Sequence, residues 1–505
     1  MKRFRITMLT TAFCAAMISR PAFADTDAAT AQQIQAMQAQ IQALQAQLQS
    51  MQTQVAATNQ AVQQQASAAS SSTGGLQNKN IKLTVGGFIE AAGIERSRGE
   101  AADLASSWSG IPLNNSTNGS MSEFRESSRQ SRLSLLAQGS PDANTDLAAY
   151  FEGDFLGAAP TANSAESNSY TPRLRQAYAT YDRSDLGFHF LGGQAWSLIT
   201  MDKQGIIPRQ ENVPQTIDAG YVPGFTWTRN TQMRFVEDFD NHKIWAGISF
   251  ESPQANIASS VGTPASGAPI VTAGGGSGYA STVNYSLDAA PDVIAKVAFD
   301  PGWGHYEVYG VGRVFRDQPS LGGGTDTIYG GGIGAGAILP IIDKKLEFQV
   351  SGLAGRGVGR YGSVQLPDVT TTANGTLAAV TTVEVLAGLT AHPNEHWDLY
   401  LYSGFEETQK TYSDSGSNHF GYGNPQYDNS QCSVEGASST HCVGNTRAVG
   451  QITGGAWWKF YKGSYGMMEA GLQDSYSKRY VFDGIGGGPT ANENITMVSF
   501  RYYPF

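Results

Sequence analysis

The sequence predicts a large antiparallel β-barrel of the outer-membrane type, preceded by an α-helical coiled coil. Three observations predict it: an export signal opens the chain, a heptad repeat follows, and from Ile81 apolar and polar residues alternate with a period of two. The composition agrees. The chain contains 59 Gly, 22 Phe, 22 Tyr and 8 Trp, which suits barrel strands flanked by aromatic girdles at both membrane interfaces.

Residues 1–24 have the features of a secretory signal peptide. Lys2, Arg3 and Arg5 form a positive start, residues 6–18 form a short apolar core, and Ala22-Phe-Ala24 is a cleavage site before Asp25. No other run is long and apolar enough for a spanning helix. Removal of the signal takes away basic residues only, so the mature chain is more acidic than the full-length net charge of −10. This acidity argues against nucleic acid as a partner.

Residues 25–66 are predicted to form an oligomeric coiled coil. Apolar residues recur in steps of three and four, almost entirely among Gln and Ala, which indicates a left-handed coiled coil. The alternative is a Gln/Ala-rich linker without structure. The heptads alone allow a dimer or a trimer. The oligomerisation residues are Ile34, Met37, Ile41, Leu44, Leu48, Met51 and Val55.

A Ser/Gly-rich linker at 67–80 separates the heptads from the predicted barrel at 81–505. Short polar turns alternate with long loops along the barrel, which gives 16 strands. The short turns are expected at 140–145, 184–185, 240–241, 300–303, 341–343, 392–394 and 461–463. The long loops are expected at 95–126, 157–172, 197–228, 252–290, 317–326, 358–380, 408–446 and 479–493.

This alternation also predicts the location and orientation of the chain. Short turns of such barrels lie on the periplasmic side, so both barrel ends and the coiled coil are expected there, with the barrel in outer-membrane lipid. The chain ends on a terminal Phe505, which is typical of these barrels. Arg501 occupies an alternate position that is usually apolar. Either Pro504 shifts the phase of this strand, or Val498, Phe500 and Tyr502 form its lipid-facing side.

Several basic residues are predicted to face the channel, because each alternates with apolar neighbours on its strand. A ring of cations at one level is what an anion-selective constriction requires. The alternative is that these cations pair with inward acids such as Glu152, Asp154, Glu307 and Glu347, and only stiffen the wall. The candidate pathway residues are Arg132, Arg173, Arg175, Arg234, Arg313, Lys296 and Arg129.

The loop at 201–230 is long and holds Pro208, Pro214 and Pro223, together with Arg209 and Trp227. It follows the fifth predicted strand, where general porins fold a loop into the channel. The alternatives are a loop that covers the rim and one that packs against a neighbouring subunit.

The two cysteines of the mature chain, Cys432 and Cys442, are expected to form a disulfide bond within a polar loop. His441 leaves a metal site as an alternative, but no second Cys/His cluster completes a ligand set. The histidines are scattered and no nucleophile or phosphate-binding motif stands out. We therefore expect no enzyme activity, no metal and no cofactor.

An ordered series of motifs resembles the DcaP-like outer-membrane porins over essentially the whole mature chain. The motifs follow the signal, the Gln-rich heptads and the linker. They are KLTVGGFI at 82–89, RQSRL at 129–133, RLRQAY at 173–178, GGQAW at 192–196 and DPGWGH at 300–305.

The resemblance implies a homotrimer of 16-stranded barrels with a periplasmic N-terminal coiled coil. It also implies passive uptake of small anions, dicarboxylates especially, through an arginine-lined constriction. The family's basic constriction carries over best to Arg132, Arg173 and Arg175, and less directly to Arg234 and Arg313.

Two other functions fit the same sequence. One is a general or sugar-type porin, which would need an inward aromatic ladder, for instance Trp245, Tyr309, Tyr400, Tyr402 and Trp457. The other is a plugged barrel that tethers the envelope, with the coiled coil in contact with peptidoglycan.

Overall fold

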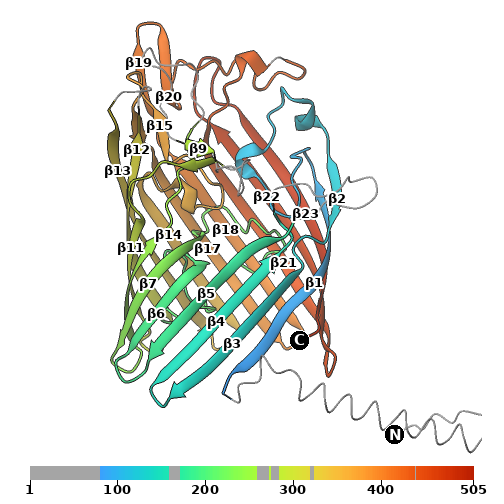
Figure 1. Cartoon of the computed structure of the whole chain (residues 1–505). Coiled ribbons are helices and arrows are strands. Elements are labelled where there is room, and N and C mark those ends of the chain that lie inside the picture. The colour runs from blue at the N-terminus through green and yellow to red at the C-terminus, as the bar shows by residue number, and fades with distance from the viewer. Residues whose placement is uncertain (1–79, 158–170, 259–271, 275–283, 319–323, 438) are drawn as a thin grey trace, which may run out of the picture. The chain divides into compact units, whose positions relative to one another are not determined.

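The structure, a computed structural model, describes residues 80–157, 171–258, 272–274, 284–318, 324–437 and 439–505. The predicted signal, coiled coil and nearly all of the linker lie outside the described residues. Residues 80–505 form one compact unit, the closed barrel drawn in Figure 1. Among the described residues, no helix has the length and apolar character needed to cross a membrane.

The barrel wall is a single antiparallel sheet (Figure 1). Its strands are β1 (Lys82–Arg96), β2 (Glu123–Ser127), β3 (Arg132–Asp142), β4 (Thr145–Asp154), β5 (Arg173–Arg183), β6 (Phe188–Trp196), β7 (Arg229–Phe239), β8 (Ile244–Glu251), β11 (Asp292–Phe299), β12 (His305–Asp317), β13 (Asp326–Ile342), β14 (Leu346–Arg356), β17 (Thr381–Asn394), β18 (Trp397–Thr408), β21 (Thr446–Gly463), β22 (Gly466–Val481) and β23 (Thr490–Tyr503).

β2 and β3 together form one wall strand. β2 pairs with the upper part of β1 at Ala92–Arg96, and β3 pairs with the lower part at Lys82–Phe88. The wall therefore has 16 strands, as predicted. β1 closes the ring by pairing with β23, from Ile89 opposite Tyr502 to Arg96 opposite Ile495. The closure leaves no full-length free edge, which a wall in lipid requires.

All seven predicted short turns are hairpins, and the predicted long loops connect strands at the opposite end. The loops carry short elements of their own. These are η1 (Trp108–Gly110), η2 (Thr117–Ser120), η3 (Gly359–Tyr361), η4 (Ser439–His441), and the hairpins of β9 (Thr272–Gly274) with β10 (Asn284–Ser286), β15 (Val369–Thr371) with β16 (Leu377–Ala379), and β19 (Thr411–Ser415) with β20 (Asn418–Tyr422).

Strand alternation sorts the side chains as the sequence predicted. Apolar residues such as Ile89 and Leu472 are exposed on the outer surface, while polar residues such as Gln232 are buried inside. At the C-terminus, Val498 and Phe500 face outward and Arg501 faces inward. The open question of this strand's phase is thereby answered in favour of an outward Val498, Phe500 and Tyr502.

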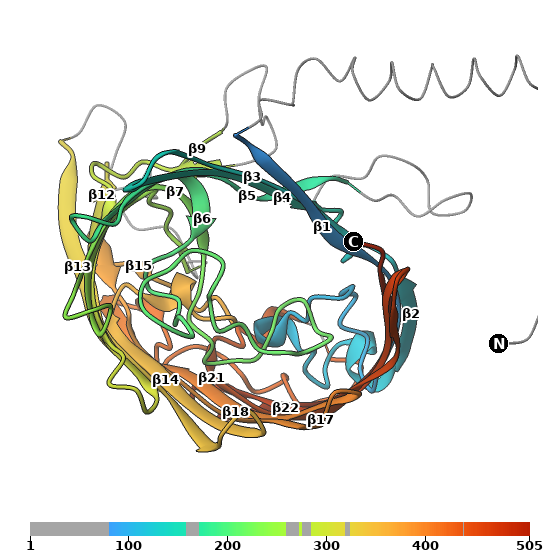
Figure 2. The same ribbon diagram turned by 90° about the horizontal axis from the view of Figure 1, so that it is seen from below.

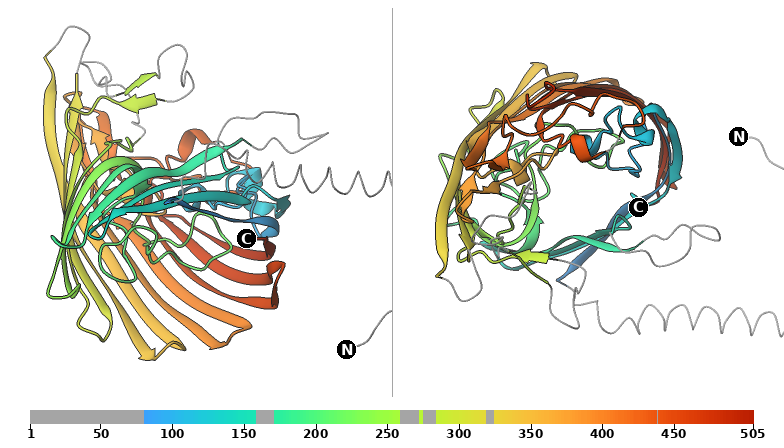
Figure 3. Two further views of the ribbon diagram at one scale, coloured as in Figure 1. Left: turned by 60° about the horizontal axis from the view of Figure 1, so that its bottom comes forward. Right: turned by 90° about the horizontal axis from the view of Figure 1, so that it is seen from above.

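The connection between β6 and β7, residues 197–228, folds into the barrel instead of covering its rim. We call it the inward loop, and Figure 2 and the tilted view in Figure 3 show this green segment crossing the lumen. Ile217, Val222 and Phe225 pack against Tyr400 and Tyr402 of the opposite wall. The loop backbone is also bonded there, since Gly224 N donates to Glu406 Oε1 at 2.7 Å and Ile217 N donates to Gln473 Oε1 at 2.7 Å.

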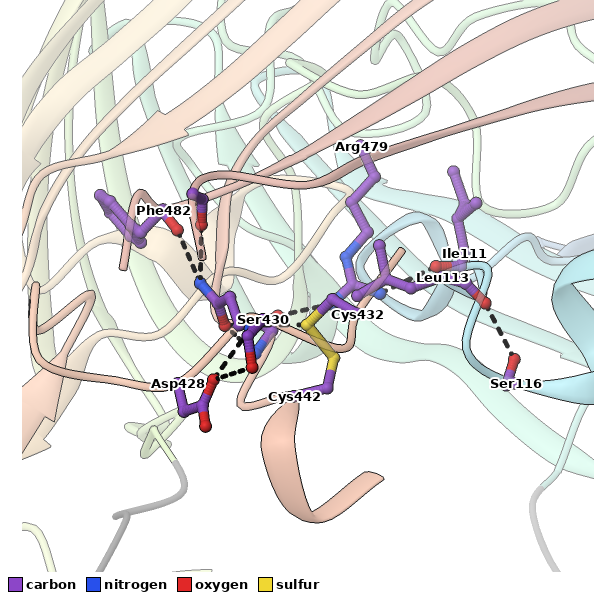
Figure 4. The surroundings of a disulfide bond; sticks show 12 residues. Ile111, Leu113, Ser116, Asp428, Ser430, Cys432, Cys442, Arg479 and Phe482 are labelled. Carbon is purple, nitrogen blue, oxygen red and sulfur yellow. Dashed lines mark hydrogen bonds between the residues drawn. A yellow bond between two sulfur atoms is a disulfide. The ribbon is translucent and has the colours of Figure 1, made fainter. Parts of the chain in front are cut away.

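Cys432 and Cys442 are joined by a disulfide bond in the loop between β20 and β21 (Figure 4). The bond closes this loop on itself, and the buried Cys432 packs in one cluster with Val449 and with Leu113 of the first long loop. His441 Nδ1 lies 2.7 Å from Asp428 Oδ2. Because both sulfurs are bonded to each other, neither is available as a metal ligand.

Candidate permeation pathway

A cavity of about 490 Å³ separates the inward loop from one side of the wall. The wall residues come from β1, β3–β6, β18 and β21–β23, and the inward loop contributes residues from 209 to 221. Among the described residues, five basic and four acidic side chains line it. They are Arg132, Arg175, Arg209, Lys459 and Arg501, with Glu152, Glu211, Asp398 and Glu469.

Two of the sequence-predicted cations, Arg132 and Arg175, line this cavity. Arg175 is almost fully buried and its guanidinium bonds both Glu152 and Asp154. Arg132 is less constrained: its side chain is 22% exposed and its Nη1 lies 3.8 Å from Glu152 Oε2. Its Nε is buried and has no hydrogen-bond partner among the described residues, so the Nη atoms are the ones that can reach a solute. Arg132 therefore has capacity left for an anion.

Arg173 and Arg129 lie near these residues but are not among the cavity-lining residues. Arg173 forms a bidentate pair with Asp154 at 2.7 and 2.9 Å. Arg129 bonds Asp103 at 3.1 Å and the carbonyl oxygens of Phe155 and Gly157, so it fastens loops to each other. In both cases the guanidinium stabilises the wall around the cavity.

Lys296 faces inward as predicted, but the inward loop covers it. Its Nζ donates to the carbonyl oxygen of Thr200 at 2.7 Å and lies 3.3 Å from Asp202 Oδ2 and 3.0 Å from Glu307 Oε2. The side chain is fully buried. Lys296 thus binds the inward loop to the wall instead of lining the cavity.

Arg234 and Arg313 are also inward and covered. Arg234 bonds Gln232 and the carbonyl oxygen of Trp196. Arg313 pairs with Asp292 at 3.2 Å and Asp368 at 2.7 Å. The expected single ring of cations is therefore divided. One group faces the cavity and another lies buried between loop and wall, because the sequence pattern cannot show which inward positions a loop covers.

Arg209, Arg501 and Lys459 line the cavity although they were not among the predicted residues. Arg501 pairs with Glu90 at 2.9 Å and Lys459 pairs with Asp398. Arg209 lies on the exposed side of the inward loop and donates to the Tyr178 hydroxyl at 3.0 Å. No carboxylate within ion-pair distance of its guanidinium is found among the described residues. The parity of β23 would have revealed Arg501, whereas no periodic signal marks Arg209.

A further cation, Arg229, begins β7 just behind the cavity. Its guanidinium lies 4.9 Å from the ring centres of both Trp196 and Trp227, and its Nη1 has no hydrogen-bond partner in the described chain. Tyr221 of the inward loop lies close by. Burial alone would raise the pKa of Tyr221, but the positive charges of Arg175, Arg229 and Arg132 outweigh burial and lower it. Arg175, Arg229 and Arg132 thus concentrate positive charge around Tyr221.

Glu211 is the acidic counterpart on the inward loop. Burial, together with the nearby Asp202 carboxylate, raises the pKa of Glu211 to about 7. Its side chain accepts a hydrogen bond from the backbone N–H of Arg209. The charge that this residue contributes to the cavity thus changes near neutral pH.

The proposed aromatic ladder does not form a continuous track along the lumen. Trp245, Tyr309, Tyr400, Tyr402 and Trp457 face inward, but all are buried. Tyr402 accepts a hydrogen bond from Gln215 N at 3.2 Å, and Trp457 Nε1 donates to Gln215 O at 2.8 Å. These rings support the inward loop, and of the five only Trp457 lines the cavity.

Among the described residues, no group of three or more His, Cys, Asp and Glu side chains is arranged to hold a metal ion.

The fold is shared with a solved outer-membrane channel. The chain is similar to the DcaP channel of Acinetobacter baumannii, with a TM-score of 0.59, 15% identity and coverage of 84% of this chain and 99% of that one. An anion-selective porin from Comamonas acidovorans aligns with a TM-score of 0.45, 10% identity and coverage of 84% and 99%. OmpT of Vibrio cholerae gives a TM-score of 0.43 at 10% identity, with coverage of 84% and 97%.

No protein-family model and no curated protein matches the sequence. The likeness to the DcaP channel confirms the expected porin-type barrel, and at this level of identity it shows the fold alone.

Proposed function

We propose that the protein is a passive outer-membrane porin that prefers small anionic solutes, dicarboxylates among them. One observation carries the proposal: the inward loop narrows the lumen to a cavity in which Arg132 and Arg209 lack full carboxylate pairing. Guanidinium groups bind carboxylates in bidentate geometry. A partly hydrated anion can therefore accept hydrogen bonds from these guanidinium groups, whereas a cation is repelled by them.

Most of the remaining charges in the cavity lining are paired. Glu152 is shared between Arg175 and Arg132, and Glu90 neutralises Arg501. Because five cations are set against four carboxylates in the lining, the net field is weak. Weak, multiple contacts suit a diffusive channel, since a solute must leave as readily as it binds. The predicted preference is accordingly graded and does not amount to strict exclusion of cations.

The proposal includes a homotrimer in the outer membrane with the coiled coil in the periplasm. The apolar outer wall supports the membrane location, and the heptads at 31–62 support a multimer. A deletion of residues 31–66 tests the second part. It should weaken the oligomer on native gels while each barrel stays folded, and an unchanged trimer would mean that the barrel walls alone hold the subunits together.

The reversal potential of the purified protein across a KCl gradient in a planar bilayer tests the function. The proposal predicts an anion-selective potential and partial block of the chloride current by succinate. Cation preference, or indifference to succinate, would favour a general or sugar-type porin. The absence of conductance would favour the plugged barrel that tethers the envelope.

A further inference from the structure

Six aromatic side chains line the same cavity as the arginines. They are Phe88, Tyr150, Trp196, Tyr221, Trp457 and Tyr503. They come from five wall strands, β1, β4, β6, β21 and β23, and from the inward loop, so rings line the cavity on both its wall side and its loop side. A constriction that recognises only small hydrated anions needs polar donors and has no use for so many rings. The lining therefore calls for a second explanation.

Guanidinium groups and rings alternate along the wall. Arg501 lies 4.8 Å from the ring centre of Phe88 and 4.2 Å from that of Trp457, while Arg132 lies 5.3 Å from Phe88. The Phe88 ring also packs against Tyr503 at 5.3 Å. These contacts occupy much of the surface of Phe88 and Trp457, which are both buried. They explain those two rings as supports for the cations.

Tyr150 differs from Phe88 and Trp457 because its ring, which packs against Tyr178 at 5.5 Å, remains half-buried and borders the cavity. The Arg209 guanidinium lies 5.9 Å from the centre of the Tyr150 ring. The Tyr150 hydroxyl donates a hydrogen bond to Glu152 Oε2 at 3.0 Å. Glu152 in turn faces Arg132. An accessible ring is thus placed between the two arginines that have unused donor capacity.

We infer that the preferred solutes are aromatic carboxylates, which use both features at once. The carboxylate would bind Arg132 or Arg209, and the solute ring would pack against Tyr150. A cavity of about 490 Å³ accommodates a single-ring solute together with water. This inference rests on the proposed function, because it assumes that anions pass through this cavity.

The test compares benzoate with cyclohexanecarboxylate, which has the same charge and carbon skeleton without the aromatic ring system. Each is titrated against the chloride current of the wild-type channel in a planar bilayer. Ring contacts predict half-block by benzoate at about a fivefold lower concentration than by cyclohexanecarboxylate. Equal half-blocking concentrations would overturn the inference.

Variants of Tyr150 locate the effect. Tyr150→Leu should bring the two half-blocking concentrations together, whereas Tyr150→Phe, which keeps the ring, should preserve the difference. Tyr181→Leu on the neighbouring strand β5 is the matched control, because Tyr181 faces outward. A difference that survives Tyr150→Leu would place the ring contact elsewhere and contradict the assignment of Tyr150. Should Tyr150→Leu fail to fold, the half-blocking concentrations of the two acids in the wild type and in Tyr150→Phe still test the inference.

The KCl reversal potential keeps the two proposals separate. An anion-selective channel that treats both acids alike would overturn only the aromatic inference. A channel without anion preference would overturn the proposed function, whatever the outcome with the two acids.

Discussion

Arg132 and Lys296 begin as equivalent features of the sequence, each a basic residue on the inward face of a strand. In the structure, Arg132 borders a cavity and its side chain is 22% exposed, whereas Lys296 is fully buried under the inward loop. Lys296 has two carboxylates within 3.3 Å, and Arg132 has one at 3.8 Å. Coverage by the loop, and not strand position, separates a cation that can bind solute from one that stabilises the fold.

The charged side chains around Lys296 and those around Arg132 therefore have different roles. On the β11–β12 side, Lys296, Glu307, His305 and Asp300 form a continuous network that also includes Asp202 of the inward loop. On the β3–β5 side, cations outnumber acids around the cavity. The network on the β11–β12 side fixes the position of the inward loop. In that position, Arg209 of the loop faces the cavity on the β3–β5 side.

The largest expected effect is a loss of stability when the buried charge network under the inward loop is disrupted. Lys296→Met leaves the buried Asp202 without its lysine partner and Glu307 with His305 as its remaining basic partner, which costs about 3–5 kcal/mol of unfolding free energy. Denaturant unfolding of the barrel in detergent measures it. Lys243→Met, at an exposed turn, is the control and should change stability by less than about 1 kcal/mol. Equal stability of the two variants would mean that the buried network does not hold the loop.

The disulfide lies in a loop that belongs neither to the network around Lys296 nor to the cavity around Arg132. Replacing Cys432 and Cys442 with Ala removes a link across a sequence separation of 10, worth about 3 kcal/mol in chain entropy. Residues 408–446 should be cleaved faster by protease, while ion selectivity stays unchanged because neither cysteine lines the cavity. A shift in the reversal potential of this variant would show that the outer loops also control selectivity.

Arg209→Gln tests the uncovered region with a smaller expected effect. It removes a cavity-lining charge that has no carboxylate partner among the described residues, so the chloride-to-potassium permeability ratio should fall about threefold. Folding should be unaffected, since the side chain makes one hydrogen bond. Arg183→Gln, whose charge is paired with Asp185 at a short turn, is the control. The prediction fails if both variants keep the wild-type ratio.

The smallest effect is a pH dependence that belongs to Glu211. Its pKa of about 7 means that the carboxyl is mostly neutral at pH 6 and mostly charged at pH 8. The chloride-to-potassium permeability ratio should therefore rise by about twofold on acidification over this range. Glu211→Gln should remove the dependence and hold the ratio at its acidic value. A slope that persists in this variant would assign the titration to another group.

Local periodicity was enough to predict the barrel. The period of two predicted the inward direction of Arg132, Arg175, Lys296 and Arg313, and the alternation of seven short turns with long loops predicted the strand number. Local periodicity could not predict which inward side chains the loop covers, because the inward loop contacts the wall through residues distant in sequence, such as Ile217 with Gln473. Arg501 was missed because Pro504 obscured the phase of the last strand. Arg209 was missed because a loop has no period.

The most direct measurement is the reversal potential of the Arg132→Gln/Arg209→Gln double variant across a KCl gradient. Both residues border the cavity with incomplete pairing, so their loss should abolish the anion preference while single-channel conductance stays measurable. Retention of the wild-type potential would contradict the claim that uncovered arginines set selectivity, and would direct attention to charges outside this cavity.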